Sequence, residues 1–194
     1  YLGHLAVGVP GTVKGFELAM QKYGKLSWKD VIAPAIELAE NGFVLNKRRA
    51  NSFNGLKRMQ KIPKDFEDAL RKSKEFFRVF SKSDGSDFAE GDIFVQKDLA
   101  ESLKLIANQG SEAFYEGKIA ELIARDMEKH GGLITKEDLA RYEAFVREPV
   151  KGNYRGYEII SMPPPSSGGT ILIEMLNILE GFDLGTMERY GPKA

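Results

Sequence analysis

Two serines followed by two glycines, Ser166-Ser167-Gly168-Gly169, form a candidate binding segment in this sequence. They lie between a stretch rich in β-forming residues and an apolar run that predicts a helix. Free backbone N–H groups at the start of a helix can bind a carboxylate or a phosphate, and glycines let a ligand approach closely. We interpret Ser166, Ser167 and Gly168 as a loop that lines a substrate pocket. The alternative is a capped helix start that follows a proline-rich stop.

A complete catalytic site is not predicted. A serine nucleophile needs a neighbouring base, and the only histidines are His4 and His130. His130 precedes two glycines and is typical of a helix C-terminus, where the helix dipole favours a cation. The acidic residues are dispersed, so no His/Asp/Glu cluster predicts a metal site. Cysteine is absent, which excludes disulfides and a cysteine nucleophile. We expect neither a metal nor a cofactor.

The overall composition excludes two classes of partner. Lys plus Arg and Asp plus Glu are 28 each in 194 residues, so the basic excess that is typical of a nucleic-acid-binding protein is missing. No apolar run reaches the roughly 20 residues that a membrane-spanning helix needs. The glycines before Phe16 do not match a nucleotide-binding pattern. Tyr1 is not a start methionine, and we expect the chain to be a piece excised from a longer protein.

Helical spacing of apolar residues dominates the first three quarters of the sequence. Thr12 and Ser27 are typical N-cap residues, and Thr135 with Asp138 forms a variant of the capping box. We expect helices after both N-caps and after the capping box, and also over Lys47–Met59, Phe66–Arg71, Asp98–Asn108 and Ile119–Lys129.

Extended structure is expected mainly near the end of the chain. The residues from Tyr154 to Met162 are rich in β-formers and predict the best strand, and Thr170–Leu179 predicts an apolar helix. We therefore expect an α+β protein that is predominantly α-helical, with one helix-rich domain over 1–194 and a strand-loop-helix segment over 145–181 within it.

Four blocks of residues, taken in order, resemble the γ-glutamyltranspeptidase family across nearly the whole chain. Each motif alone is weak, but four in the right order and spacing are specific. The blocks are Gly8-Val-Pro-Gly-Thr-Val-Lys-Gly-Phe16; Tyr23-Gly-Lys-Leu with Pro34-Ala-Ile-Glu-Leu-Ala and Asn41-Gly-Phe; Phe114-Tyr115-x-Gly117 with Gly131-Gly-Leu-Ile-Thr-Lys-Glu-Asp-Leu139 and Tyr142; and Tyr154-Arg-Gly-Tyr157 with Met162-Pro-Pro-Pro-Ser-Ser-Gly-Gly169 and Leu176-Asn-Ile-Leu179.

The resemblance implies an N-terminal-nucleophile hydrolase with an αββα fold, to which this stretch contributes mostly outer helices and few strands. In this family a precursor cuts itself, and a threonine that begins the small subunit attacks the γ-glutamyl carbonyl of glutathione or a related compound. The acyl group then passes to water or to an amino acid. The resemblance further implies a small-subunit partner from the same precursor, a γ-glutamyl substrate, and a periplasmic or secreted location.

No catalytic residue carries over to this chain. Its threonines are Thr12, Thr135, Thr170 and Thr186, and none has the context of the nucleophile. The substrate-binding arginine of the family corresponds to a position just before Tyr1, and the oxyanion-hole glycines belong to the small subunit. We therefore expect the isolated chain to be inactive and its helices to expose apolar stripes. Three alternatives stay open: an acylase acting on cephalosporin side chains, a poly-γ-glutamate depolymerase, and a non-catalytic helical interaction module.

Overall fold

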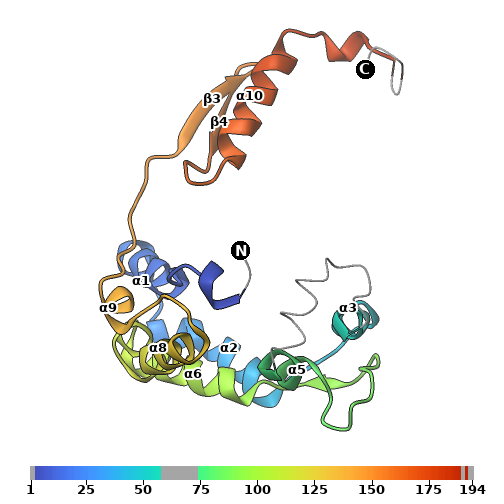
Figure 1. Ribbon diagram of the computed structural model, residues 1–194. Coiled ribbons are helices and arrows are strands. Elements are labelled where there is room, and N and C mark those ends of the chain that lie inside the picture. The colour runs from blue at the N-terminus through green and yellow to red at the C-terminus, as the bar shows by residue number, and fades with distance from the viewer. Residues whose placement is uncertain (1–2, 58–73, 189–190, 192–194) are drawn as a thin grey trace. The chain divides into compact units, whose positions relative to one another are not determined.

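The computed structural model describes residues 3–57, 74–188 and 191. The chain divides into two compact units, residues 1–144 and 145–194 (Figure 1). Helices predominate, and the described residues add two small antiparallel sheets of two strands each. This confirms the expected α+β class with few strands. The strand-loop-helix segment expected from residue 145 onward begins where the second unit begins.

The described part of the first unit is built almost entirely from helices. Its described elements are η1 Gly3–Ala6, α1 Thr12–Tyr23, α2 Trp28–Asn41, β1 Phe43–Val44, α3 Lys47–Lys57, α5 Lys74–Phe80, β2 Ile93–Phe94, α6 Lys97–Gln109, α7 Glu112–Tyr115, α8 Lys118–His130 and α9 Lys136–Ala140. The helix expected over Phe66–Arg71 lies outside the described residues.

Local signals explain several of the helix ends. The Ser27 hydroxyl accepts a hydrogen bond from the backbone N–H of Asp30, as an N-cap does, and α2 continues through Pro34. Thr135 and Asp138 form the expected capping box at the start of α9. The expectation for Thr12 was wrong by one residue, because Gly11 occupies the N-cap position of α1 and no side chain caps this end.

Besides the cluster of Ile106, Ala113 and Ile119, against which Trp28 and Ile32 of α2 pack, two apolar clusters hold the first unit together. One surrounds the fully buried Tyr115, Ala120 and Leu139, and joins α7, α8 and α9. The other is aromatic and links β1 to β2 through Phe43 and Phe94, with Phe53, Phe80 and Phe88 packed around them. Phe43 and Phe88 each meet Phe94 edge to face, an arrangement that stabilises a cluster beyond the area that the rings bury.

The second unit is a β-hairpin packed against one helix (Figure 1). Strands β3 (Val150–Tyr154) and β4 (Tyr157–Ser161) pair with Val150 opposite Ser161, and α10 (Gly168–Glu180) and η2 (Leu184–Thr186) follow. The single strand expected from Tyr154 to Met162 was wrong at its start. Arg155 and Gly156 both have positive φ, 50° and 85°, which turns the chain back on itself.

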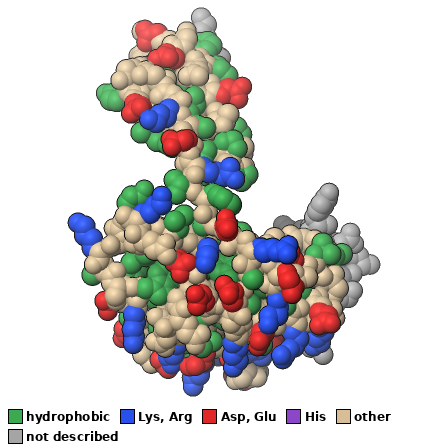
Figure 2. Space-filling model, turned by 90° about the vertical axis from the view of Figure 1, so that its left-hand side faces the viewer, with side chains coloured by type: hydrophobic (Ala, Val, Ile, Leu, Met, Phe, Trp, Pro, Cys, Tyr) green, Lys and Arg blue, Asp and Glu red, His purple; other side chains and the backbone are tan. Residues whose placement is uncertain are grey.

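The surface agrees with the balanced composition. Basic and acidic side chains are interspersed over the face of the first unit that Figure 2 shows. Within the described ranges, no helix combines the length and the apolar character that a membrane crossing requires.

Candidate functional site

The predicted loop Ser166–Gly168 connects β4 to α10 in the second unit, and all three residues are exposed. The Ser166 backbone N–H donates to the Pro163 carbonyl at 3.2 Å, and the Ser166 hydroxyl accepts from the Gly168 N–H at 3.3 Å. Ser167 occupies the N-cap position of α10 without a side-chain capping bond. The sequence therefore placed these residues correctly at a helix start. Their role in lining a substrate pocket stays a prediction.

Gly169, the next residue, explains why this loop contains glycine. It is buried, and a Cβ atom on it would lie 2.2 Å from the Met162 carbonyl oxygen and 2.8 Å from Val150 Cγ2. The first turn of α10 thus abuts the hairpin so closely that no side chain fits between them. The close approach fixes where the α10 N-terminus, with Ser166 and Ser167 beside it, stands relative to the sheet.

The first unit contains a second polar group, built from Lys14, Glu17 and Ser111. Lys14 and Glu17 lie one turn apart on α1, and Ser111 lies between α6 and α7. The Ser111 hydroxyl donates to Glu17 Oε2 at 2.6 Å and accepts from Lys14 Nζ at 3.0 Å, while Lys14 Nζ and Glu17 Oε2 are 3.3 Å apart. The Ser111 N–H also donates to Glu17 Oε1 at 3.3 Å. All three side chains are therefore mutually satisfied.

The Tyr115 side chain also holds the start of α1 in place. Its hydroxyl donates to the Pro10 carbonyl at 2.7 Å and accepts from the Lys14 backbone N–H at 3.2 Å. Its ring stacks on Tyr142 with ring centres 5.7 Å apart. A Cβ atom on Gly11 would lie 2.0 Å from the Tyr142 hydroxyl, so this position also lacks room for a side chain. The segment from Pro10 to Glu17 is thus fixed by residues about 100 positions later.

The electrostatic surroundings of Glu17 favour its charged form, which the hydrogen bonds from Ser111 and Lys14 hold in place. Burial acts to raise the pKa of Glu17, but the hydrogen bonds from Ser111 and the neighbouring Lys14 outweigh burial, and the net pKa is lowered. Burial raises the pKa of the Tyr115 hydroxyl, so this group keeps the proton that it donates to Pro10.

These contacts identify a structural anchor and not a nucleophile. Ser111 is 1% exposed, and both its proton and a lone pair are already engaged. A serine that attacks a substrate needs access and a base that is free to accept its proton. No local pattern in the sequence predicts this group, because Glu17 and Ser111 are 94 residues apart.

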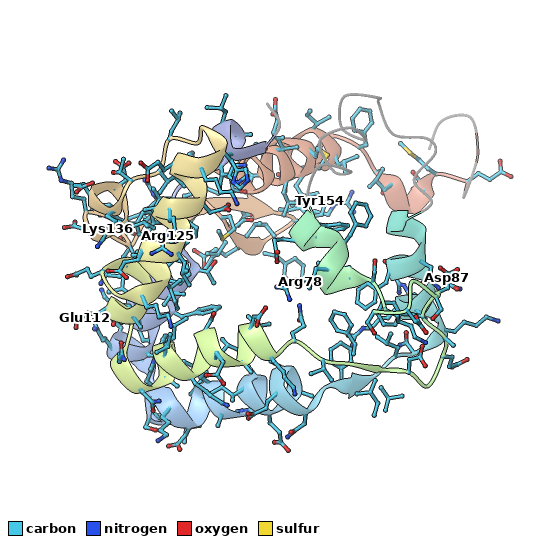
Figure 3. The ribbon with its side chains drawn as sticks, turned by 60° about the horizontal axis from the view of Figure 1, so that its bottom comes forward. Arg78, Asp87, Glu112, Arg125, Lys136 and Tyr154 are labelled. Carbon is cyan, nitrogen blue, oxygen red and sulfur yellow. The ribbon has the colours of Figure 1, made fainter. Side chains whose placement is uncertain are left out.

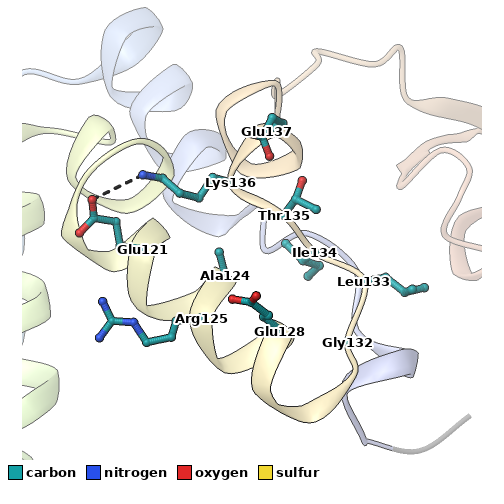
Figure 4. A pocket seen from close by; sticks show the side chains of 10 residues that line it. All are labelled: Glu121, Ala124, Arg125, Glu128, Gly132, Leu133, Ile134, Thr135, Lys136 and Glu137. Atoms are coloured by element: carbon teal, nitrogen blue, oxygen red, sulfur yellow. Dashed lines mark hydrogen bonds and ion pairs between the residues drawn. The ribbon is translucent and has the colours of Figure 1, made fainter.

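An open depression of about 690 Å³ lies between α8 and the segment that leads into α9 (Figure 4). Arg125 and Lys136 both line it and lie on the same side of the first unit (Figure 3). Lys136 forms a 3.4 Å ion pair with Glu121, and the Thr135 hydroxyl is held by Asp138 in the capping box. The described lining residues thus provide charge but no paired nucleophile and base.

The structure corrects one expectation. The sequence indicated no His/Asp/Glu cluster, yet His4, Asp126 and His130 place one ligand atom each within 4.8 Å of one another. Asp126 and His130 lie one turn apart on α8, a spacing that the sequence does contain, but His4 lies 122 residues before Asp126. Only the fold could bring the third residue to the pair.

The similarity to known proteins extends over the whole chain. A family model described as γ-glutamyltranspeptidase matches residues 1–193. The glutathione hydrolase proenzyme of Escherichia coli (strain K12) is 46% identical over 188 residues, which cover 97% of this chain and 30% of that protein. The acylase ACY 1 proenzyme of Pseudomonas sp. (strain SE83) is 41% identical over 186 residues, covering 96% of this chain and 31% of that protein.

The fold of the chain is also similar to that of solved structures. The crystal structure of Helicobacter pylori γ-glutamyltranspeptidase matches with a TM-score of 0.88 at 46% identity, and the match covers 98% of this chain and 52% of that chain. The present chain spans about 30% of the length of the curated relatives that it matches.

Proposed function

Because the chain belongs to the γ-glutamyltranspeptidase family, we propose that it is part of the large subunit of an enzyme that cleaves γ-glutamyl bonds in glutathione and related compounds. The enzyme transfers the γ-glutamyl group to water or to an amino acid through an acyl-enzyme on a threonine. The observation that carries this proposal is the family match over residues 1–193.

Within that enzyme, the chain acts as scaffold. Ser111 and Tyr115 are committed to internal hydrogen bonds, and both fix the first turns of α1. A rigid support of this kind suits a site whose reacting groups must be held to within a fraction of an ångström. The attacking threonine and the oxyanion-hole donors come from the small subunit of the same precursor. The isolated chain is therefore inactive.

The proposed partner also explains the apolar surface of α10. Ile171, Met175 and Ile178 are 47%, 49% and 60% exposed, and they recur at helical spacing along one side of that helix. An exposed apolar stripe on a helix usually marks an interface. We propose that the remainder of the αββα fold covers it, so that all 194 residues form part of one domain in the whole enzyme.

Two further features of the proposal follow from the family. The loop Ser166–Gly168 lines the pocket for the γ-glutamyl substrate, with the exposed hydroxyls of Ser166 and Ser167 as donors. The whole enzyme is periplasmic or secreted.

A second candidate reaction is hydrolysis of a cephalosporin side-chain amide. The match to the crystal structure of cephalosporin acylase from Bacillus halodurans, with a TM-score of 0.78 at 30% identity, favours it. Poly-γ-glutamate depolymerisation stays a further alternative for the same acyl-transfer chemistry. The family match argues against a non-catalytic helical module, because that match covers the chain from end to end.

The test compares substrates on the intact, self-cleaved protein. We expect release of the aniline from a γ-glutamyl anilide, and faster release when an amino-acid acceptor is added, because the acceptor removes the γ-glutamyl group from the acyl-enzyme in addition to water. A cephalosporin with an acyl side chain serves as the competing substrate. Deacylation of the cephalosporin without turnover of the γ-glutamyl anilide would replace the proposed reaction with the acylase reaction.

A further inference from the structure

His4 of η1 and Asp126 and His130 of α8 bring two imidazoles to one carboxylate. His4 Nε2 lies 2.8 Å from Asp126 Oδ2, and His130 Nδ1 lies 3.2 Å from Asp126 Oδ1. The two imidazole rings stack with centres 4.6 Å apart and an angle of 20° between their planes. His130 Nδ1 also donates a hydrogen bond to the Asp126 backbone carbonyl at 2.9 Å, so an ion that binds this nitrogen replaces that bond. Each ring thus has a nitrogen within 3.2 Å of the Asp126 carboxylate.

The backbones of α8 and η1 position these three side chains. Asp126 and His130 lie one turn apart, so their side chains emerge from the same face of α8. The helix ends at Gly131, whose φ of 70° is left-handed, and Gly132 follows it closely (Figure 4). A Cβ atom on Gly132 would lie 3.0 Å from the Cβ of His4, so η1 rests directly against the end of α8.

The donor set suits a divalent transition-metal ion. Zinc binds imidazole nitrogen and carboxylate oxygen at about 2.0–2.2 Å in tetrahedral geometry, which separates neighbouring ligand atoms by about 3.3 Å. The distances of 2.8 Å and 3.2 Å are close to this separation. The side chains of His4 and His130 are 32% and 43% exposed, which leaves an approach for the ion and room for water as a further ligand.

We propose that His4, Asp126 and His130 form a binding site for a divalent transition-metal ion such as Zn²⁺. The ion displaces the proton of the hydrogen bond between His4 and Asp126, and this proton is released to solvent. It ties η1 to the end of α8 and so restrains the chain that leads into α1. The function is structural, since the three residues come from two surface elements of the first unit and the described part of the chain sets no nucleophile beside them.

His4 and His130 are the only histidines within these 194 residues, so no other histidine and no cysteine competes for the ion. Intact protein freed of metal is titrated with Zn²⁺ by calorimetry and with Co²⁺ by visible absorption, which reports tetrahedral coordination. Cu²⁺ bound at the site gives an electron paramagnetic resonance spectrum that counts the nitrogen ligands, and two are expected.

Substitutions assign the binding to this site. His4→Ala and His130→Ala each weaken the binding of one equivalent of ion by at least about tenfold, since loss of an outer-shell partner alone costs 10- to 100-fold. Asp126→Asn keeps the shape of the side chain and weakens ion binding to the same extent. This variant keeps the test decisive if a histidine variant misfolds. Glu128→Gln, on the same helix but outside the cluster, serves as the matched control and binds like the wild type.

Two results would overturn the proposal. One is that the wild-type protein shows no saturable binding up to about 1 mM ion. The other is that the His4 and Asp126 variants, folded by circular dichroism, bind the ion as tightly as the wild type does.

Discussion

The Ser111 hydroxyl donates a 2.6 Å hydrogen bond to Glu17 Oε2, across a separation of 94 residues. Ser111 also accepts from Lys14, so a single buried hydroxyl connects two residues of α1 to the junction of α6 and α7. A hydrogen bond to a charged group contributes more to stability than one between neutral groups, and removing one partner leaves the other unsatisfied. Loss of this contact is therefore expected to lower the stability of the first unit.

Ser111→Ala tests the contact directly. The variant removes one hydrogen-bond donor from the partly buried Glu17 carboxylate. We therefore expect the free energy of unfolding to fall by about 1–3 kcal/mol. Ser83→Ala, in an exposed loop, is the control and should change it by less than about 0.5 kcal/mol. Urea unfolding followed by circular dichroism measures both. Equal effects for the two variants would mean that Ser111 is not an anchor.

The lowered pKa of Glu17 predicts a dependence of stability on acid pH. The carboxylate titrates in the unfolded chain near its usual value of 4.5 and at lower pH in the folded chain. Its contribution is thus fully present above pH 4.5 and is lost as the pH falls through the folded pKa. We expect Glu17→Gln to lower stability at neutral pH, with the difference from the wild type narrowing as the medium becomes more acidic.

Unfolding at a series of pH values measures this difference. Glu116→Gln removes an exposed carboxylate from the neighbouring segment and controls for the change in net charge. A constant gap between Glu17→Gln and the wild type at every pH would contradict the assignment, because an effect of packing alone does not follow the titration of a carboxylate.

Adjacent glycines at the start of α10 allow a matched comparison. Gly169→Ala places a Cβ atom 2.2 Å from the Met162 backbone oxygen, whereas the nearest atom to a Cβ on Gly168 is the Ser166 hydroxyl at 3.5 Å. Overpacking of this kind typically costs about 1–3 kcal/mol, while alanine within a helix is favoured over glycine by about 1 kcal/mol.

We therefore expect Gly169→Ala to lower the melting temperature of the second unit and Gly168→Ala to leave it unchanged or to raise it. Thermal unfolding monitored by circular dichroism distinguishes the two variants. The close approach between α10 and the hairpin would be refuted if Gly169→Ala were as stable as Gly168→Ala.

Local chemistry made much of the fold predictable. Ser27 and the pair Thr135 and Asp138 carry cap signals within three or four residues of the groups that they satisfy, and the structure confirms both. The hairpin turn was missed, because Arg155 is a side-chain-bearing residue with positive φ, which is uncommon.

The candidate sites were less predictable, because their residues meet only in three dimensions. The anchor needs Ser111 beside Glu17, and the metal-ligand cluster needs His4 beside Asp126, with separations of 94 and 122 residues. No periodicity in a sequence encodes such pairs. The loop Ser166–Gly168 was located correctly because a proline-rich stretch, two glycines and an apolar run mark a helix start locally.

The central claim is that this chain supports a γ-glutamyl-transferring site whose nucleophile lies in another part of the same precursor. The most direct measurement is the rate of aniline release from a γ-glutamyl anilide by the intact, self-cleaved protein and by the 194-residue chain alone. We predict turnover by the intact protein and none above the buffer rate by the isolated chain. Turnover by the isolated chain, or its absence in the intact protein, would contradict the claim.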